Sequence, residues 1–440
     1  MKNKNTKPNY FKTIISLDNI KEAYQEVMEK FYNPKTDTYT LGKLARGIDG
    51  DCFGIFQRGI NKKFKQIQKE LKNFEKPLPS VDLKIPKSSN PNKFRIISIS
   101  ALKEKIKHQA VSRVMIGKLE EIYSENLYSY REKRGAYLAM KEFRREILKS
   151  EEPLYIYKVD MKDYFDNLDH QILLDLMDKY FEDKQLTKLI HTLIKQRRLS
   201  SDGLVDSHKG VVQGIAISGD MANLYLADLD KEMQDKEEKY FRVGDDIVVL
   251  HKNRKKLEEL ANYIEDYLTK KRKLPINKEK TEILNPDESF VYLGYEIRDK
   301  NLKIAKRNCD KMKNKIRQKL NKKLTKNINR KKVDKSLLLH EILMLIFPQT
   351  RVPDHVMWLR YFLLSTDPSQ IRQMDDFIEE RIRLLFFGKK RNKNKNLLPL
   401  KVLRSFGYVS LIQIYYDITH GRKSFHDYVK KLTIKPKIKR

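Results

Sequence analysis

The chain has 440 residues and carries 92 Lys and Arg against 59 Asp and Glu, a formal net charge of +33. Hydrophobic residues make up 40% of the chain, which is enough for a sizeable core and excludes disorder throughout. At roughly 150 residues per domain, the length predicts two or three domains. The two cysteines, Cys52 and Cys309, provide neither a disulfide framework nor a Cys-rich zinc site. This fits a reducing compartment, so we expect a cytoplasmic protein.

The apolar segments favour a protein without membrane spans. The basic N-terminus, residues 1–18, lacks the apolar core of roughly 7–15 residues that a secretory signal requires. The most apolar stretch, residues 337–347, contains His340 and Glu341. It is shorter than the roughly 20 residues of a membrane-spanning helix, so we expect a buried helix there and no membrane partner.

The positive charge is concentrated in the last third of the chain. Residues 301–440 hold 35 basic and 11 acidic side chains, whereas the first 300 residues have a net charge of only +9. Between residues 301 and 335, 15 Lys and Arg are opposed only by Asp310 and Asp334. A solvated surface usually mixes both signs, so this segment is expected to face a polyanion. Nucleic acid is the first candidate, ahead of a membrane surface or an acidic protein.

Hydrophobic spacing and turn residues predict the elements in chain order. In the first 200 residues we expect strands over 81–85, 94–99 and 154–159, and helices over 18–32, 56–74, 102–123, 136–148, 172–181 and 185–195. Further on, we expect a helix over 255–271, a loop that becomes a helix over 211–233, and strands over 240–243, 247–250, 281–284 and 291–297. After residue 303 the pattern is mostly helical. The fold class is therefore α+β, with a basic helical domain beginning within 287–306.

Two segments place acidic residues at the ends of predicted strands. Strand 154–159 leads into Asp160, and the segment FRVGDDIVVL at 241–250 places Asp245 and Asp246 at the tip of a tight turn. If the strands are neighbours, the three carboxylates meet, and their repulsion is costly without a cation. Mg²⁺ prefers carboxylate, phosphate and water oxygens, and two such ions roughly 4 Å apart support phosphoryl transfer. Taken alone, an Asp pair in a turn is also ordinary turn chemistry.

These segments belong to a series of blocks whose order is informative. The series is GIDG at 47–50, KFRII at 93–97, NLYSYREKR at 126–134, VDMKDYFDNLDH at 159–170, GVVQGIAISGDMANLYLADLD at 210–230, RVGDD at 242–246, NKEKT at 277–281 and FVYLGYEI at 290–297. In this order and spacing, the blocks resemble those of the bacterial reverse transcriptases, a group that includes group II intron, retron and phage-defence enzymes. The resemblance covers roughly residues 45–300.

The resemblance implies a right-hand polymerase fold, with fingers and an antiparallel palm in residues 1–300 and an all-α basic thumb and extension in residues 301–440. It implies an RNA-directed DNA polymerase, a nucleotidyltransferase that uses two Mg²⁺ ions, which Mn²⁺ can replace. Asp160, Asp245 and the main-chain carbonyl of Met161 would hold the ions, with Asp246 as a further ligand or an electrostatic support. Lys280 would donate a proton to the leaving pyrophosphate.

The same resemblance assigns a dNTP site. Arg95, together with Lys93 or Lys87, would neutralise the triphosphate. Gln213 and Gly214 would lie along the template and the nascent pair. Phe165 occupies the position of the steric gate that leaves no room for a 2′-hydroxyl. RNA-dependent RNA polymerases, which also carry Gly-Asp-Asp, usually have an Asp at that position, so a DNA product is favoured.

The segment after the polymerase core is where a thumb helix would follow a duplex. In residues 306–335, apolar positions at helical spacing are embedded in lysines, which would bind phosphates without reading sequence. The predicted nucleic-acid contacts are Lys311, Lys315, Lys319, Lys322, Arg131 and Arg134.

The sequence also departs from the family pattern. Val243 and Gly244 stand where Tyr (or another aromatic or aliphatic residue) and Ala are usual, and Val212 and Gly219 replace two prolines. Two cysteines cannot build the Cys-rich endonuclease of many group II intron proteins, and no clear retron block is found. The favoured expectation is a stand-alone enzyme that copies a dedicated structured non-coding RNA in antiphage defence, with its oligomeric state open. The alternatives are a template-independent nucleotidyl transferase or an RNA-dependent RNA polymerase on the same palm, and a catalytically idle RNA-binding scaffold.

Overall fold

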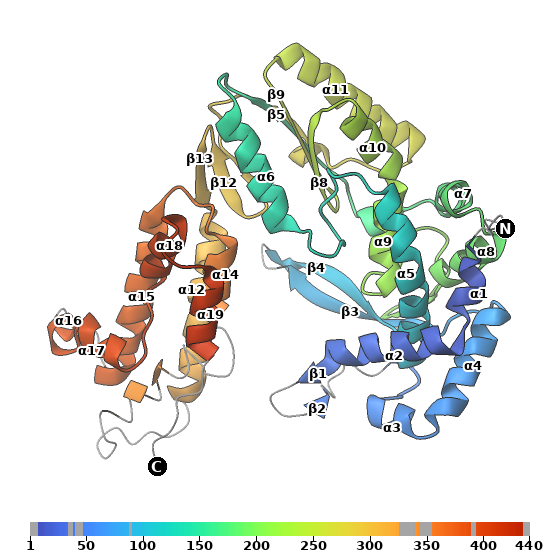
Figure 1. The fold of residues 1–440 in the computed structure, drawn as a ribbon, viewed down its shortest axis with the longest axis horizontal. Coiled ribbons are helices and arrows are strands. Elements are labelled where there is room, and N and C mark those ends of the chain that lie inside the picture. The colour runs from blue at the N-terminus through green and yellow to red at the C-terminus, as the bar shows by residue number, and fades with distance from the viewer. Residues whose placement is uncertain are drawn as a thin grey trace, which may run out of the picture. The chain divides into compact units, whose positions relative to one another are not determined.

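The structure is a computed structural model, and it describes residues 8–33, 38–39, 47–87, 90–324, 336, 339–340, 342–343, 354–388 and 393–433. The chain divides into two compact units (Figure 1). The first comprises Met1–Glu146 and Ser150–Pro286, and the second comprises Ile147–Lys149 and Asp287–Arg440. The predicted buried helix at 337–347 lies largely outside the described residues.

A four-stranded antiparallel sheet, called the central sheet below, organises the first unit. Its strand order is β10-β5-β9-β8. The strands are β5 (Tyr155–Asp160), β8 (Lys239–Val243), β9 (Asp246–His251) and β10 (Glu282–Leu284). The run Ile247–Leu250 in β9 is completely buried, which is typical of a strand covered on both faces.

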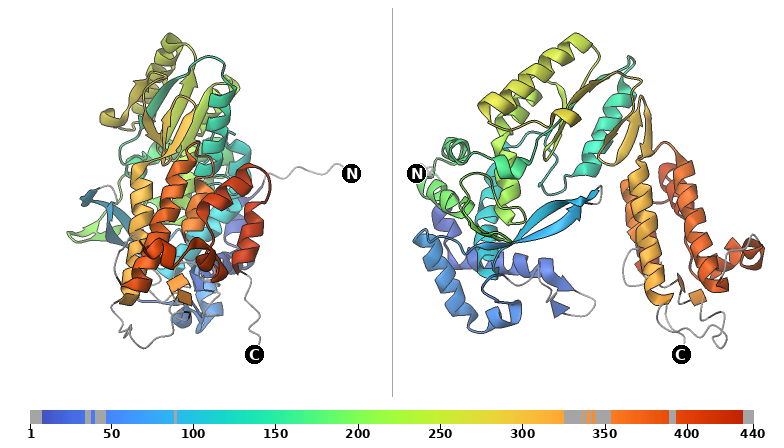
Figure 2. Two further views of the ribbon diagram at one scale, coloured as in Figure 1. Left: turned by 90° about the vertical axis from the view of Figure 1, so that its left-hand side faces the viewer. Right: turned by 180° about the vertical axis from the view of Figure 1, so that it is seen from behind.

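Helices cover both faces of the central sheet. Helix α11 (Arg254–Asp266) contacts β5 and β9 and lies along the sheet in Figures 1 and 2. Consecutive residues of β8 point to opposite faces, as expected for a strand. Tyr240 donates its hydroxyl to Asp230 of α10 (Ala227–Asp235), whereas Phe241 packs edge-on against Phe143 of α6 (Ala136–Lys149), with ring centroids 5.6 Å apart.

A second four-stranded sheet and a group of helices complete this unit. The sheet has the order β4-β3-β6-β7, in which only the β3–β6 pair is parallel. Its strands are β3 (Ser80–Lys87), β4 (Asn90–Ile99), β6 (Arg198–Ser200) and β7 (Gly203–Val205). The remaining elements are α1 (Tyr10–Ile14), α2 (Leu17–Phe31), β1 (Tyr32–Asn33), β2 (Thr38–Tyr39), α3 (Phe53–Gln57), α4 (Ile60–Lys72), α5 (Leu102–Ile122), η2 (Tyr164–Asn167), α7 (His170–Phe181), α8 (Lys184–Ile194), α9 (Ala216–Tyr225), η3 (Tyr267–Lys271) and η4 (Lys278–Lys280).

Helix α5 lies at the centre of the helical part, packed against α2 and α9. Its residues Leu102, Ile106, Met115 and Leu119 are fully buried. Burying one such side chain stabilises a fold by about 1.5–3 kcal/mol, so this helix anchors the elements that surround the central sheet.

The second unit opens with a small antiparallel sheet and continues as helices. The sheet consists of β11 (Phe290–Tyr292), β12 (Tyr295–Arg298) and β13 (Asn301–Ile304). The described residues beyond Ile304 contain helices α12 (Lys306–Leu324), α14 (Asp354–Tyr361), α15 (Pro368–Phe387), α16 (Asn394–Leu397), α17 (Leu400–Ser405), α18 (Leu411–Thr419) and α19 (Phe425–Thr433). Within the described ranges, no helix is both long and apolar enough to cross a bilayer.

The α+β class predicted from the sequence is confirmed, and several elements differ in detail. The helix expected over 56–74 begins only after Gly59, whose φ of +71° interrupts it. The helix expected to run to residue 233 breaks at Leu226 into α9 and α10. The strand expected over 291–297 is two strands, because Leu293 and Gly294 form a turn with φ of +45° and +89°.

Candidate active site

The central sheet brings the predicted aspartates together. Asp160 is the last residue of β5 and pairs directly with Asp246, the first residue of β9. Val243 pairs with Asp246 across the β8–β9 hairpin, so Gly244 and Asp245 form a two-residue turn. Gly244 has a φ of +69°, as the first central position of a type II′ turn requires. The Met161 amide donates to the Asp245 carbonyl at 3.4 Å, which joins the ends of the two segments.

The electrostatics of this group show an excess of negative charge. Burial, followed by the charges of Asp245 and Asp160, raises the pKa of Asp246 to about 6. Asp160 is only 8% exposed, and its Oδ2 accepts from Lys280 Nζ at 2.9 Å and from Asn277 Nδ2 at 3.1 Å. Burial alone would lower the pKa of Lys280, but its hydrogen bond to Asp160 and the charges of the three aspartates outweigh that effect and raise it.

The donor set is compatible with a divalent cation that arrives with its own ligands. Within the described residues, no three His, Cys, Asp or Glu side chains form a preassembled metal-binding group. Mg²⁺ commonly binds through one or two carboxylates together with substrate phosphates and water, and a complete protein cage is not needed. The paired carboxylates Asp160 and Asp246, with their unbalanced charge, fit such a partial site.

A buried polar network supports the turn from inside. The Arg242 side chain is completely buried and pairs with Asp230, with Nε 2.8 Å from Oδ1. The same guanidinium donates to the carbonyls of Gly244 at 3.3 Å and Asn223 at 3.1 Å. The amide of Gly244 donates to Ser129 Oγ at 2.9 Å, and Asn223 in turn donates to the Ser129 carbonyl at 2.8 Å. Both polar groups of Gly244 are therefore held by side chains.

Sequence reasoning assigned no role in the site to Ser129, Arg242 or Asp230. The sequence did contain a signal for Arg242 and Asp230. Arg242 stands in a β-prone run, where burial is expected, and a buried cation needs an acidic partner. Ser129 gave no comparable signal, since its contact to Gly244 spans 115 positions of the chain.

Phe165, Gln213 and Gly214 lie on two segments that bond to each other, and the second of these also bonds to β4. Phe165 belongs to the short helix η2, and its carbonyl accepts from the Val211 amide at 2.8 Å. The Ser98 amide of β4 donates to the Gln213 carbonyl at 3.2 Å. A Cβ at Gly214 would lie 3.3 Å from the Ser98 carbonyl oxygen, and the φ of Gly214 is +103°, so a glycine suits this close approach.

Two predicted triphosphate contacts cannot be placed by their side chains. Lys93 and Arg95 belong to β4, where Arg95 pairs with Ile85. The side chains of both residues lie outside the part of the chain that the structure describes, so their role remains a prediction.

The predicted nucleic-acid contacts have different surroundings. On α12, Lys311 and Lys315 are exposed, and Lys315 and Lys319 both pair with Asp354, at 3.6 Å for Lys315. The side chain of Lys322 is outside the described residues.

Arg131 and Arg134 make internal bonds. Arg131 donates to Glu120 and to the Ser124 and Leu127 carbonyls, and only 5% of its side chain is exposed. Arg134 pairs with Glu125. Both arginines brace the 124–134 segment.

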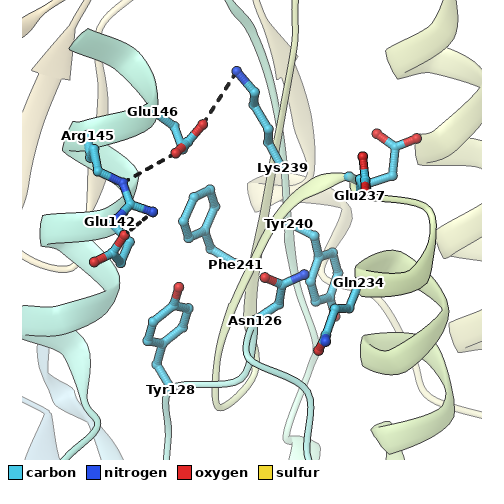
Figure 3. A pocket seen from close by; sticks show the side chains of 11 residues that line it. Asn126, Tyr128, Glu142, Arg145, Glu146, Gln234, Glu237, Lys239, Tyr240 and Phe241 are labelled. Carbon is cyan, nitrogen blue, oxygen red and sulfur yellow. Dashed lines mark ion pairs between the residues drawn. The ribbon is translucent and has the colours of Figure 1, made fainter. Parts of the chain in front are cut away.

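A surface hollow beside the central sheet is separate from the aspartates. It is lined by Asn126, Tyr128, Glu142, Arg145, Glu146, Gln234, Glu237, Glu238, Lys239, Tyr240 and Phe241, none of them a predicted site residue. Figure 3 shows Glu146 between two cations, 3.5 Å from Arg145 Nε and 3.6 Å from Lys239 Nζ. The carboxylate of Glu146 is thus paired with cations on two elements that line the hollow.

Comparison with known proteins identifies the part of the chain that holds the aspartates. Residues 85–297 match the family described as reverse transcriptase (RNA-dependent DNA polymerase). The chain contains a reverse transcriptase domain. This domain includes Asp160, Asp245, Asp246, Phe165 and Lys280. These residues belong to the sequence blocks that resemble those of the reverse transcriptases.

The reverse transcriptase domain has bacterial relatives of moderate similarity. The chain is 24% identical over 283 residues to the group II intron-encoded protein LtrA of Lactococcus lactis subsp. cremoris, covering 59% of this chain and 46% of LtrA. It is 23% identical over 297 residues to protein YkfC of Escherichia coli K12, covering 58% of this chain and 76% of YkfC. The chain thus aligns with about half the length of LtrA. Among solved structures, apo telomerase from Candida tropicalis is similar with a TM-score of 0.46 and 15% identity, over 87% of this chain and 67% of that chain.

Proposed function

We propose that this protein is an RNA-directed DNA polymerase that adds deoxynucleotides to a primer 3′-hydroxyl. The observation that carries the proposal is the direct pairing of Asp160 with Asp246, with Asp245 in the adjoining turn, inside a reverse transcriptase domain. Phe165, on the turn that follows β5, supports a DNA product.

Divalent cations would complete the acidic group. Asp160, Asp245, Asp246 and the Met161 carbonyl are the residues that would hold Mg²⁺, or Mn²⁺ in its place. When bound, such ions stabilise the charge on the attacking and leaving oxygens of a phosphoryl transfer.

The protein's own side chains would do the remaining work. Lys280, whose ammonium already lies against Asp160, would supply the proton that the leaving pyrophosphate takes up. Phe165 would exclude a ribose 2′-hydroxyl, and Gln213 with Gly214 would line the nascent pair. Lys93 and Arg95 would neutralise the triphosphate.

We further infer that the template is a dedicated structured non-coding RNA and that the enzyme serves antiphage defence in the bacterial cytoplasm. The net charge of +24 in residues 301–440 supports an RNA partner beyond the short primer–template duplex. Sequencing RNA that co-purifies with the protein, and comparing phage plaque counts with and without Asp245→Asn, tests this part of the proposal.

Primer extension tests the polymerase activity itself. Wild type, Asp245→Asn and the control Asp266→Asn would be given an RNA template, a DNA primer, Mg²⁺ and labelled dNTPs or NTPs. Asp266 is an exposed residue at the end of α11 that pairs with Lys270 at 2.7 Å, so its substitution leaves the carboxylate group of the site unchanged. We expect DNase-sensitive product from wild type and Asp266→Asn, and a loss on the order of 1,000-fold for Asp245→Asn.

The other outcomes identify the alternatives. Product from NTPs would indicate an RNA polymerase, and product without template would indicate a terminal transferase. RNA binding without any product, and with Asp245→Asn behaving as wild type in cells, would indicate a binding scaffold.

A further inference from the structure

An exposed aromatic ring lies against Phe165. The ring centroids of Tyr130 and Phe165 are 5.8 Å apart, and the ring planes meet at 89°. The buried Tyr164 also contacts Phe165, with a centroid distance of 5.9 Å and an angle of 67°. Tyr164 is fixed, because its hydroxyl donates to the Ala222 carbonyl at 2.5 Å. Phe165 therefore contacts one buried ring and one exposed ring, since Tyr130 is 54% exposed.

The position of the Tyr130 ring depends on Gly219. A Cβ at Gly219 would lie 2.8 Å from Tyr130 Cγ and 3.0 Å from both Cβ and Cδ1 of that tyrosine. Real Cβ atoms do not come this close to ring carbons, so any other residue at 219 would displace the ring. Gly219 is one of the positions at which the sequence departs from the family pattern. The space that the Tyr130 ring occupies therefore depends on a residue that differs from this pattern.

The backbone at Tyr130 is also held in an uncommon conformation. Its φ is +52°, which costs energy for a residue with a side chain and persists only where neighbours enforce it. Both neighbours are anchored, since Ser129 bonds to Gly244 and Asn223, and Arg131 bonds to Glu120. The segment 129–131, which supports the turn that carries Asp245, thus also fixes the position of the Tyr130 ring.

We propose that Tyr130 is a positioning residue for sugar selection, which holds the Phe165 ring in the orientation that excludes a ribonucleotide. The inference rests on the proposed function, because Phe165 selects sugars only if the domain polymerises nucleotides. Edge-to-face contacts between aromatic rings are directional, so loss of one of the two rings leaves Phe165 free to turn aside.

The test is the ratio of kcat/KM for a dNTP to that for the matching NTP, measured at one template position. Tyr130→Ala is expected to lower this ratio on the order of tenfold, through faster ribonucleotide addition, with dNTP addition within about threefold of wild type. Tyr130→Phe keeps the ring and should keep the ratio. Tyr263→Ala, which removes a surface tyrosine of α11 that is 38% exposed, is the matched control and should behave as wild type.

Gly219→Ala provides an independent variant. The added methyl group displaces the Tyr130 ring, so this variant should lower the ratio as Tyr130→Ala does. In the Tyr130→Ala background the contacts to the ring carbons are gone and only the 3.0 Å approach to the Cβ of residue 130 remains, so adding Gly219→Ala should have a much smaller effect than it has in the wild type. Should Tyr130→Ala fail to fold by circular dichroism, Tyr130→Leu is judged by the same criteria.

The outcomes separate this inference from the proposed function. An unchanged ratio in Tyr130→Ala and Gly219→Ala, with DNA synthesis intact, would overturn the role of Tyr130 and leave the polymerase standing. Fully additive effects of the two substitutions would also overturn it. Absence of dNTP addition by wild type would overturn both.

Discussion

The ammonium group of Lys280 lies 2.9 Å from a carboxylate oxygen of Asp160, although 120 positions separate the two residues in the sequence. Two further bonds hold this approach: the Asn277 amide donates to the Asp160 carbonyl at 2.8 Å, and its side chain donates to the same carboxylate. The block that carries Lys280 is thus tied to the end of β5 independently of the lysine. A side chain placed in this way can act both as a counter-charge and as a proton donor.

Two substitutions of Lys280 separate these roles. Arg keeps the charge but gives up its proton far less readily, whereas Ala removes both. If proton donation matters, Lys280→Arg and Lys280→Ala should each lower kcat for dNTP addition on the order of 100-fold, with smaller changes in KM. Single-turnover extension measures this. Lys278→Ala, an exposed lysine of the same short helix, is the control. Recovery of wild-type kcat in Lys280→Arg would limit Lys280 to a counter-charge.

Removing one partner of the buried pair of Arg242 and Asp230 should strongly destabilise the first unit. Both side chains are completely buried, so Asp230→Asn leaves an uncompensated guanidinium and is expected to cost about 3–5 kcal/mol of the free energy of unfolding. Urea unfolding followed by circular dichroism measures this cost. Asp235→Asn, which removes an exposed partner of Lys231 on the same helix, should cost less than about 1 kcal/mol. Equal costs for the two variants would contradict this account.

Gly244 should be sensitive to a side chain for a backbone reason. A Cβ there would meet nothing within 4 Å, so the penalty of Gly244→Ala comes from its φ of +69°. We expect a loss of about 1–2 kcal/mol of stability together with slower dNTP addition, because the turn carries Asp245. Gly54→Ala is the control, since Gly54 lies in α3 with open space around it, and Ala in a helix should stabilise by about 0.5–1 kcal/mol. Thermal unfolding of both variants gives the comparison.

A buried carboxyl on α9 predicts a pH dependence of stability. Burial, more than any other cause, raises the pKa of Asp220 to about 7, despite a hydrogen bond from Ser112 Oγ at 2.6 Å. Because the folded pKa lies above the unfolded value of about 4, the native state binds the proton more tightly, and stability falls as pH rises from about 4 to 7.

The substitution Asp220→Asn removes this dependence. It should stabilise the protein on the order of 2–4 kcal/mol at pH 8, relative to wild type, and have little advantage at pH 4. Urea midpoints at the two pH values measure the difference. A stabilisation that is equal at both pH values would show that the Asp220 carboxyl does not titrate in this range.

Much of the site could be predicted from local sequence. The apolar runs before Asp160 and after Asp246 have the composition of buried strands, and two such strands with acidic ends bring their carboxylates together when they pair. The contacts of Ser129 with Gly244 and of Tyr130 with Gly219 could not be predicted in the same way. They join loops that are remote in sequence, and loops have no periodicity that reveals their neighbours.

Short strands also escaped prediction. β6 and β7 have three residues each and flank a turn at Ser201 and Asp202. The alternation of apolar and polar residues that marks a strand therefore had too few positions to be recognised. The break between β11 and β12 depends on a tertiary contact, because Asn308 of α12 donates to the Gly294 carbonyl at 2.9 Å and occupies the space a side chain at Gly294 would need.

The lysines of α12 lead to a prediction about nucleic-acid binding. Lys311 and Lys315 are exposed and four positions apart, so they lie on one face of the helix. If both contact phosphates, replacing them by Ala should weaken binding to a primer–template duplex regardless of its sequence. The slope of log K against log salt concentration should then fall in magnitude by about 1–2.

An exposed lysine of another helix provides the control for this prediction. Lys401 is an exposed lysine on α17, and Lys401→Ala should leave the salt slope within error of wild type if the effect belongs to α12 and not to net charge. Binding titrations by fluorescence anisotropy at several salt concentrations measure both slopes. Equal slopes for the double α12 variant and for Lys401→Ala would place the phosphate contacts on another surface. A lost sequence preference in the α12 variant would instead indicate contacts to bases, because phosphate contacts carry no sequence information.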